Sequence, residues 1–194
     1  MFQVRLHGRG GQGVVTAAEL LSIAGFTQGK HAQAFPSFGS ERTGAPVVSF
    51  CRLDEKEIRL REPILEPDCV IVQDPTLFHA IDVFQGLKPG GYVLINSGKS
   101  IQELGVADQL KNVPEDHIRG VNATELAIRH VGRPVPNAAL LGGFAAISGQ
   151  ITLEAVEKAI ATKFGGRIAA GNIEAARAAH AAALSKETVD AETA

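Results

Sequence analysis

Residues 8 to 13 are the part of this sequence whose types and spacing are best suited to hold a ligand. They read Gly-Arg-Gly-Gly-Gln-Gly, which fits the pattern G-x-G-x-x-G, and they lie between a predicted strand (2–7) and a predicted helix (14–28). Glycine lets backbone amides approach an anion closely, and the start of a helix adds partial positive charge. The guanidinium group of Arg9 would add a positive charge that can bind a phosphate through two N–H groups. A tight turn that binds nothing would have the same spacing, but the strand-to-helix context favours a phosphate-contacting loop. The predicted contacts are Gly8, Arg9, Gly10, Gly11, Gln12 and Gly13.

The segment after this helix narrows the choice of phosphate compound. A nicotinamide-binding Rossmann unit places Asp or Glu at the end of its second strand, where the carboxylate holds the ribose hydroxyls. The corresponding stretch here, 29–35, contains no acidic residue, and NAD is therefore disfavoured. Lys30 and His31 suit an additional phosphate, which NADP and coenzyme A both carry. The chemistry of these residues does not separate the two compounds.

A second polar loop, 37–44, follows the second predicted strand. It gathers hydroxyls, a cation and two glycines at a place where open α/β sheets bind ligands. Arg42 would grip a phosphate or a carboxylate, with Ser40 and Thr43 as short-range donors. Glu41 is expected to pair with Arg42 or with a neighbouring subunit. From chemistry alone, a solvated turn whose polar side chains satisfy only its own backbone is as good an interpretation.

The apolar periodicity predicts a β/α chain that becomes purely helical from residue 137 onward. Asp74 and Pro75, directly after an apolar strand, have the chemistry of a helix start. The predicted strands are 2–7, 30–35, 46–52, 57–61, 69–73, 92–95 and 117–121. We therefore expect an α/β fold, a doubly wound Rossmann-like or flavodoxin-like sheet with a helical C-terminal extension. It would form one domain (1–184) followed by a flexible tail (185–194).

Composition and charge exclude several classes of protein. The formal net charge of −2 argues against a nucleic-acid binder, which needs a basic face. No apolar run is long enough to cross a bilayer, and we expect neither a signal peptide nor a membrane partner. Cys51 and Cys69 are too few for an iron–sulfur cluster, and the six histidines show no metal-ligand pairing. These features fit a cytoplasmic protein without a metal of its own.

Two loops in a fixed order carry a resemblance to a known family. Residues 9–13 (Arg-Gly-Gly-Gln-Gly) before a hydrophobic helix, and residues 39–44 (Gly-Ser-Glu-Arg-Thr-Gly) before a strand, resemble the gamma subunit of pyruvate:ferredoxin oxidoreductases. Residues 136–142 (Pro-Asn-Ala-Ala-Leu-Leu-Gly) resemble the asparagine-led helix start of the same family. The similarity extends from residue 4 to about residue 142, which is most of the chain.

The resemblance implies a subunit of a 2-oxoacid:acceptor oxidoreductase. Such a complex converts a 2-oxoacid, by default pyruvate, and coenzyme A into acyl-CoA, carbon dioxide and reduced acceptor. Thiamine diphosphate and Mg²⁺ would lie between alpha and beta subunits, iron–sulfur clusters would lie in beta or delta subunits, and ferredoxin or another acceptor would take the electrons. This chain would hold none of these groups and no catalytic residue. It would help to bind coenzyme A and cover the active site.

The same resemblance assigns roles to individual residues. Residues 8–13 would contact the phosphates or the pantetheine arm of coenzyme A. The second-loop residues would face the alpha and beta subunits near the active site, and Asn137 would cap its helix beside the same crevice. The further cofactor-binding candidates are therefore Ser40, Glu41, Arg42, Thr43 and Asn137.

Two other interpretations remain open from the residues alone. A free-standing NADP-binding dehydrogenase needs a proton-transfer pair such as Tyr–Lys, and the single tyrosine, Tyr92, lies inside a predicted strand. A non-catalytic nucleotide-binding module would use the glycine-rich loop but would leave the second loop unexplained.

Overall fold

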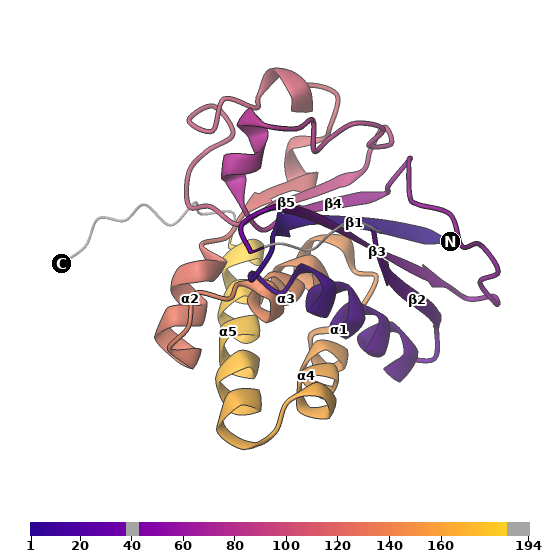
Figure 1. The fold of residues 1–194 in the computed structure, drawn as a ribbon, viewed down its shortest axis with the longest axis vertical. Helices are drawn as coiled ribbons and strands as arrows, with labels where there is room; N and C mark the ends of the chain where they lie inside the picture. The colour runs from indigo at the N-terminus through magenta and orange to yellow at the C-terminus, as the bar shows by residue number, and fades with distance from the viewer. Residues whose placement is uncertain (38–42, 186–194) are drawn as a thin grey trace.

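A computed structural model of the chain describes residues 1–37 and 43–185 and contains one six-stranded mixed sheet (Figure 1). The strands are β1 (Phe2–Arg9), β2 (His31–Pro36), β3 (Pro46–Asp54), β4 (Cys69–Val72), β5 (Tyr92–Ile95) and β6 (Ile118–Gly120). Their order across the sheet is β2-β3-β1-β4-β5-β6. β1 is antiparallel to β3 and parallel to β4, and β5 and β6 continue the parallel part. The carboxyl ends of β1, β4, β5 and β6 therefore meet at one edge of the sheet.

Within the described residues, five α-helices cover one face of this sheet (Figure 1). They are α1 (Val14–Thr27), α2 (Ala123–Val131), α3 (Asn137–Ser148), α4 (Leu153–Lys163) and α5 (Gly166–Leu184). Val4 and Leu6 of β1 point toward the helices, because alternate residues of a strand face opposite sides of the sheet. Leu21 and Phe144 are completely buried in the same core. The predicted α/β fold with a helical C-terminal region is confirmed.

The opposite face is covered by loops and short 3₁₀ helices. These helices are η1 (Pro75–His79), η2 (Asp108–Leu110) and η3 (Glu115–His117). Leu77 and Leu110 pack there against valines of β4 and β5 in a second, smaller core. The helix predicted after Asp74 is in fact a 3₁₀ helix of only five residues. A separate turn follows at Asp82, whose Oδ1 accepts the N–H of Phe84 at 3.1 Å.

The strand predicted at 57–61 is not formed. Two buried arginines on the neighbouring strands bind the chain that follows this segment. Arg52 Nη2 donates to the Glu62 carbonyl at 2.6 Å, and Arg5 Nη1 donates to the Ile64 carbonyl at 3.4 Å. These bonds tie the chain at Glu62 and Ile64 to the sheet through arginine side chains rather than through strand pairing.

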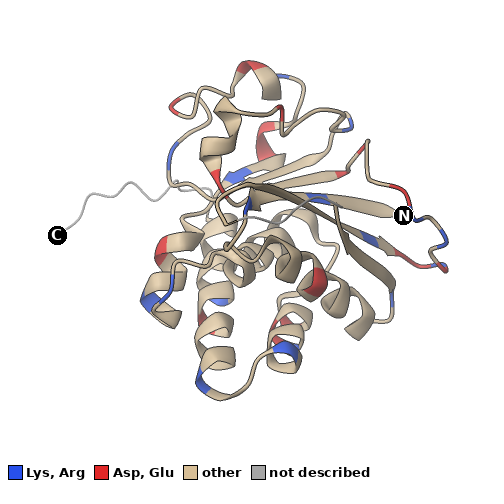
Figure 2. Cartoon of the chain, in the orientation of Figure 1, with Lys and Arg blue, Asp and Glu red and all other residues tan. Residues whose placement is uncertain are grey.

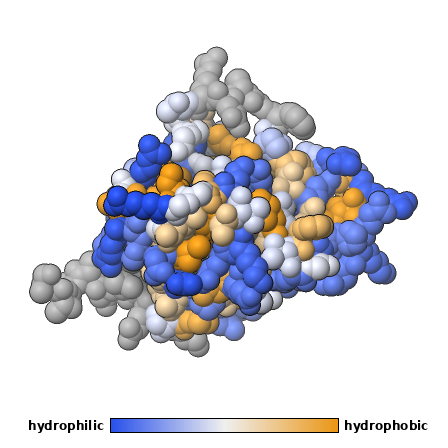
Figure 3. All heavy atoms as spheres, turned by 90° about the horizontal axis from the view of Figure 1, so that it is seen from below, coloured by the Kyte–Doolittle hydropathy of each residue, from blue (hydrophilic) through white to orange (hydrophobic). Residues whose placement is uncertain are grey.

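The described surface mixes charge and hydrophobicity. In Figure 2, acidic and basic residues are interspersed along the elements, and this view shows no basic face. Figure 3 shows the helix layer from below, where hydrophobic residues lie among hydrophilic ones. Exposed apolar side chains on the helices include Phe26, Ile128 and Ile168. No helix of the described residues has both the length and the apolar content that a bilayer span requires.

α3 and α5 approach each other so closely that Gly142 has no room for a side chain. A Cβ atom at Gly142 would overlap the carbonyl oxygen of Ala176 in α5. A Cβ atom at the adjacent Gly143 would lie 3.3 Å from two methyl groups of Leu94. The alanine-rich sequence of α5 makes this approach possible, because small side chains let two helix backbones come together.

We expect Gly142→Ala to lower the free energy of unfolding by about 2–3 kcal/mol, because the added methyl group must displace backbone atoms. Gly143→Ala is the matched control, since it lies in the same helix and gains the same helix propensity. The nearest atoms to its methyl group are side-chain atoms of Leu94 and Val121, which can shift. Denaturant unfolding of both variants measures the difference, and equal stabilities would contradict the close contact between α3 and α5.

Candidate functional site

The glycine-rich loop joins the end of the central strand β1 to the start of α1. Gly13 precedes the helix in the left-handed region, at φ 73°, and Gly11 is also left-handed, at φ 97°. The loop satisfies part of its own backbone. The Arg9 N–H donates to Gln12 Oε1 at 2.8 Å, and the Gln12 N–H donates to the Arg9 carbonyl at 3.1 Å. These bonds hold a compact turn in front of the positive end of α1.

Asn137 lies against this loop although 124 positions separate it from Gly13. Its side chain is buried, with Nδ2 3.5 Å from the Gly13 carbonyl oxygen and Oδ1 accepting the Ala138 N–H at 2.8 Å. The predicted capping role needs a correction, because Pro136 precedes α3 and Asn137 is its first residue. The structure nevertheless brings Asn137 to the glycine-rich loop, where it supports the loop from the side of α3.

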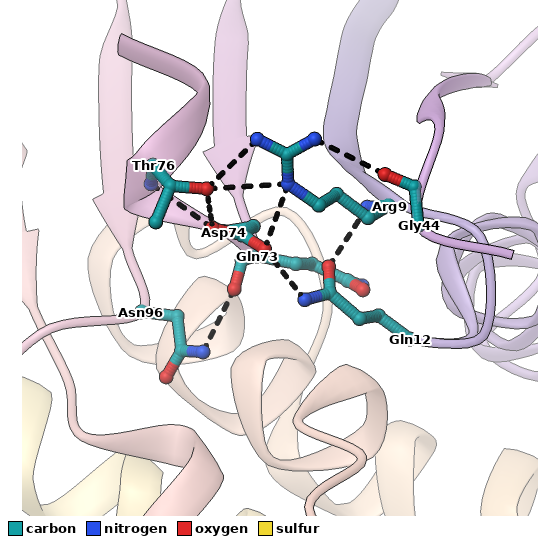
Figure 4. A network of polar contacts seen from close by, with 7 residues as sticks. All are labelled: Arg9, Gln12, Gly44, Gln73, Asp74, Thr76 and Asn96. Atoms are coloured by element: carbon teal, nitrogen blue, oxygen red, sulfur yellow. Dashed lines mark hydrogen bonds and ion pairs between the residues drawn. The ribbon is translucent and has the colours of Figure 1, made fainter. Parts of the chain in front are cut away.

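Arg9, the predicted phosphate ligand, is engaged by other residues of the chain (Figure 4). Its Nε lies 3.3 Å from Asp74 Oδ2, and its Nη2 donates to Thr76 Oγ1 at 2.9 Å. Its Nη1 donates to the Gly44 carbonyl at 3.1 Å. Gln12 Nε2 also donates to Asp74 Oδ2, at 2.8 Å. Arg9 therefore links three chain segments before any ligand is considered.

Asp74 is the central acceptor of this network, and sequence reasoning gave it only a helix-starting role. Burial opposes ionisation of its carboxyl group, but hydrogen bonds from Thr76 and Gln12, together with the charge of Arg9, hold the pKa below its usual value. Asp74 follows β4, the parallel neighbour of β1. A nicotinamide-binding Rossmann unit has its ribose-binding acid at the end of its second strand, and here the second strand along the chain, at 29–35, has none. Both carboxylate oxygens are already occupied by protein donors. Asp74 thus lies where a ribose-binding acid would lie, beside β1, but its carboxylate oxygens already accept hydrogen bonds from the protein.

An open polar pocket of about 660 Å³ adjoins the loop at the carboxyl ends of the parallel strands. Amide side chains dominate its lining, namely Gln12, Gln73, Asn96 and Asn122. Asn96 is held in place, because its Nδ2 donates to the Gln73 carbonyl and to Thr124 Oγ1, both at 2.8 Å. Lys99 is the one basic residue among the described lining residues, and Asp74 and Glu103 are acidic.

Gln73 leaves a buried amide unsatisfied beside this pocket. The residue is 1% exposed, and neither Oε1 nor Nε2 has a partner among the described residues. Figure 4 shows its side chain running behind that of Gln12, away from Asn96. Since a buried polar group without a partner costs about 1–3 kcal/mol, the crevice under the loop retains hydrogen-bonding capacity.

The second loop is described only at its two ends. Ser40, Glu41 and Arg42 lie outside the described residues, so their predicted roles stay predictions. Thr43 is exposed and forms a parallel bridge with Gly10. The Gly44 N–H donates to the Gly10 carbonyl at 3.1 Å. The end of the second loop therefore lies beside the glycine-rich loop, as a shared site would require.

The described residues offer little chemistry of their own. No group of three potential metal ligands gathers within 1–37 and 43–185. Burial raises the pKa of the Cys51 and Cys69 thiols, so neither presents a thiolate near neutral pH.

We expect Gly13→Ala to weaken the site and the fold together, lowering the free energy of unfolding by about 2–3 kcal/mol. A Cβ atom there would lie 2.5 Å from Asn137 Nδ2, and the backbone is left-handed. Gly11→Ala carries the same backbone strain with no atom within 4 Å of the new Cβ. It should cost about 1 kcal/mol. Thermal and denaturant unfolding compare the variants, and a Gly13→Ala protein no less stable than Gly11→Ala would argue against the contact with Asn137.

Comparison with known proteins shows which family the chain belongs to. The chain matches the sequence model of the pyruvate ferredoxin/flavodoxin oxidoreductase family over residues 3–182. It is 48% identical over 179 residues to the pyruvate/ketoisovalerate oxidoreductases common subunit gamma of Pyrococcus abyssi, a match that covers 92% of this chain and 95% of that protein.

Solved structures share the fold. The pyruvate oxidoreductase subunit PORC of Thermotoga maritima superimposes with a TM-score of 0.78 and 33% identity, covering 93% of this chain and 96% of that one. The fold also recurs in the 2-oxoglutarate:ferredoxin oxidoreductase of Magnetococcus marinus, with a TM-score of 0.69 and 18% identity, covering 98% of this chain and 32% of that longer one. The chain therefore belongs to the pyruvate ferredoxin/flavodoxin oxidoreductase family, as a gamma-type subunit.

Proposed function

We propose that this gamma-type chain helps to bind coenzyme A and covers the active site of a complex that oxidises a 2-oxoacid, by default pyruvate. The complex would release acyl-CoA and carbon dioxide and pass the electrons to ferredoxin or another acceptor. The observation that carries the proposal is the meeting of the glycine-rich loop, the positive end of α1 and the amide-lined pocket at one edge of the sheet.

The pocket has the size and chemistry to hold part of coenzyme A. Its volume of about 660 Å³ falls in the range of roughly 300–1,000 Å³ typical of small-molecule sites. Coenzyme A has a pantetheine arm with amide groups, and side-chain amides such as Gln12 and Asn122 are able to donate to and accept from them. Lys99 would meet a phosphate, and the unsatisfied amide of Gln73 offers one further hydrogen bond.

Partner subunits would supply the remaining groups. We propose that alpha and beta subunits hold thiamine diphosphate with Mg²⁺, that beta or delta subunits hold the iron–sulfur clusters, and that residues 40–43 face the alpha and beta subunits. Thr43, beside the glycine-rich loop, is positioned for this contact. The Magnetococcus marinus enzyme, whose structure holds coenzyme A and succinyl-CoA, carries this fold as part of a longer chain.

The choice of 2-oxoacid would be made outside this chain. The relative from Pyrococcus abyssi is a gamma subunit common to pyruvate and ketoisovalerate oxidoreductases, so in that organism one gamma chain serves two substrates. The described pocket is lined mainly by polar residues, which offer little to select between the methyl group of pyruvate and the isopropyl group of ketoisovalerate. We therefore propose pyruvate as the default substrate and place its pocket in the partner chains.

A free-standing dehydrogenase receives no support from the fold. The ring of Tyr92, at the start of β5, stacks on His117 with ring centroids 4.2 Å apart. Tyr92 therefore lies at the end of the sheet opposite the glycine-rich loop, where it would not reach a nucleotide bound there.

In the assembled complex, Lys99→Met should raise the KM for coenzyme A about ten-fold while leaving kcat nearly unchanged, because a charge-assisted contact to a phosphate is lost. Lys56→Met is the control, since Lys56 lies in the turn after β3, at the opposite end of the sheet. The complex is purified anaerobically with this chain as bait, and 2-oxoacid oxidation is measured against coenzyme A concentration. Purification of the chain without partners, or a KM for coenzyme A that Lys99→Met leaves unchanged, would count against the proposal.

A further inference from the structure

We propose that Asp74 is a positioning residue that locks the glycine-rich loop to the segment 43–46 and so sets the shape of the site. This inference rests on the proposed function only in so far as the two loops contact coenzyme A. The contacts of Asp74 with Arg9, Gln12 and Thr76 do not depend on that function.

The two oxygens of the Asp74 carboxylate bind different parts of the chain. Oδ1 accepts the Thr76 N–H at 2.9 Å and the Thr76 hydroxyl at 2.6 Å. Oδ2 accepts from Gln12 Nε2 at 2.8 Å and lies 3.3 Å from Arg9 Nε. The Asp74 side chain is 14% exposed and that of Arg9 is 29% exposed. The pair is therefore partly withdrawn from water and is less screened than an ion pair on the open surface.

Arg9 carries this restraint onward to the second loop. With Nε fixed by Asp74 and Nη2 by Thr76, the planar guanidinium presents Nη1 to the Gly44 carbonyl. Gly44 and Ala45 are in turn bound to Gly10 through two backbone hydrogen bonds, of 3.1 and 2.9 Å. A change at Asp74 should therefore be felt more than 25 positions earlier in the chain, at 43–46.

The position requires a carboxylate and not merely a polar side chain of the same size. An asparagine that kept its oxygen toward Thr76 would turn an NH₂ group toward the donors of Gln12 and Arg9. The Gln12 amide cannot turn over to accept from it, because Gln12 Oε1 already receives the Arg9 N–H at 2.8 Å. Asp74→Asn thus breaks the lock with almost no change in volume.

Asp68, at the other end of β4, provides a matched control. Its Oδ2 accepts the Gln3 N–H at 2.8 Å and its Oδ1 pairs with Lys88 Nζ at 2.8 Å. Its side chain is 22% exposed. Asp68→Asn therefore also removes one ion pair and weakens one backbone contact, but away from both loops.

Hydrogen exchange of the full chain tests the locking directly. In Asp74→Asn, the amides of residues 9, 10, 12 and 44 should exchange about ten-fold faster than in the parent, because their acceptors become mobile. In Asp68→Asn they should exchange at the parent rate, with the change confined to the surroundings of Gln3 and Lys88. Unchanged exchange of the loop amides in Asp74→Asn would overturn the inference. If Asp74→Asn does not fold, Thr76→Val removes the hydroxyl that donates to Asp74 Oδ1 and accepts from Arg9, while the backbone N–H to Oδ1 remains. This variant should also raise exchange at the same amides.

Kinetics of the assembled complex distinguish positioning from a general loss of stability. Asp74→Asn should raise the KM for coenzyme A about ten-fold with kcat largely kept, whereas Asp68→Asn should leave both unchanged. In an Arg9→Met background, Asp74→Asn should add little, because most of its effect passes through Arg9. Fully additive effects would overturn that route. Failure of the parent complex to use coenzyme A would instead sink the proposed function while leaving the exchange result intact.

Discussion

The central position of β1 is the constraint on which the rest of this structure depends. β1 is hydrogen-bonded on both sides, to antiparallel β3 and parallel β4, and its inward side chains Val4 and Leu6 are completely buried. A strand satisfied along both edges and covered on both faces has no freedom to shift register, since a one-residue slip would turn its buried side chains to the other face. The glycine-rich loop that follows β1 therefore emerges at a defined point, in the middle of the carboxyl edge.

That point is also where polar groups from distant parts of the chain converge. Asp74 arrives because β4 pairs with β1, and Asn137 arrives because α3 packs against the sheet beside α1. Gly44 arrives because β3 pairs with the other edge of β1. The result is a preorganised polar edge rather than a set of free charges. Arg9 is already paired with Asp74, whereas Lys99 is the basic residue among the described residues that line the pocket.

The polar groups at this edge are mostly amides and hydroxyls, and several of them are hydrogen-bonded to one another. The described residues bring together amides, hydroxyls, two carboxylates and one lysine at the pocket, and both cysteines are buried in the core. Such groups orient a ligand through hydrogen bonds whose geometry is fixed in advance.

The sequence by itself determined the elements that depend on local pattern. The glycine-rich loop, the strand at Tyr92–Ile95, the helical region from residue 137 and the α/β class all follow from periodicity and turn chemistry, which act over a few neighbouring residues. The two loops at 9–13 and 39–44, in their fixed order along the chain, were also enough to indicate the family. Tertiary structure alone decided which side chains occupy the site. It placed Asp74 rather than an acid of the second strand beside β1 and paired Arg9 internally. It also left 57–61 as a loop and bound the carbonyls of Glu62 and Ile64 to buried arginines. These outcomes rest on contacts between residues tens of positions apart, and strand order, which creates those contacts, is not encoded in any local pattern.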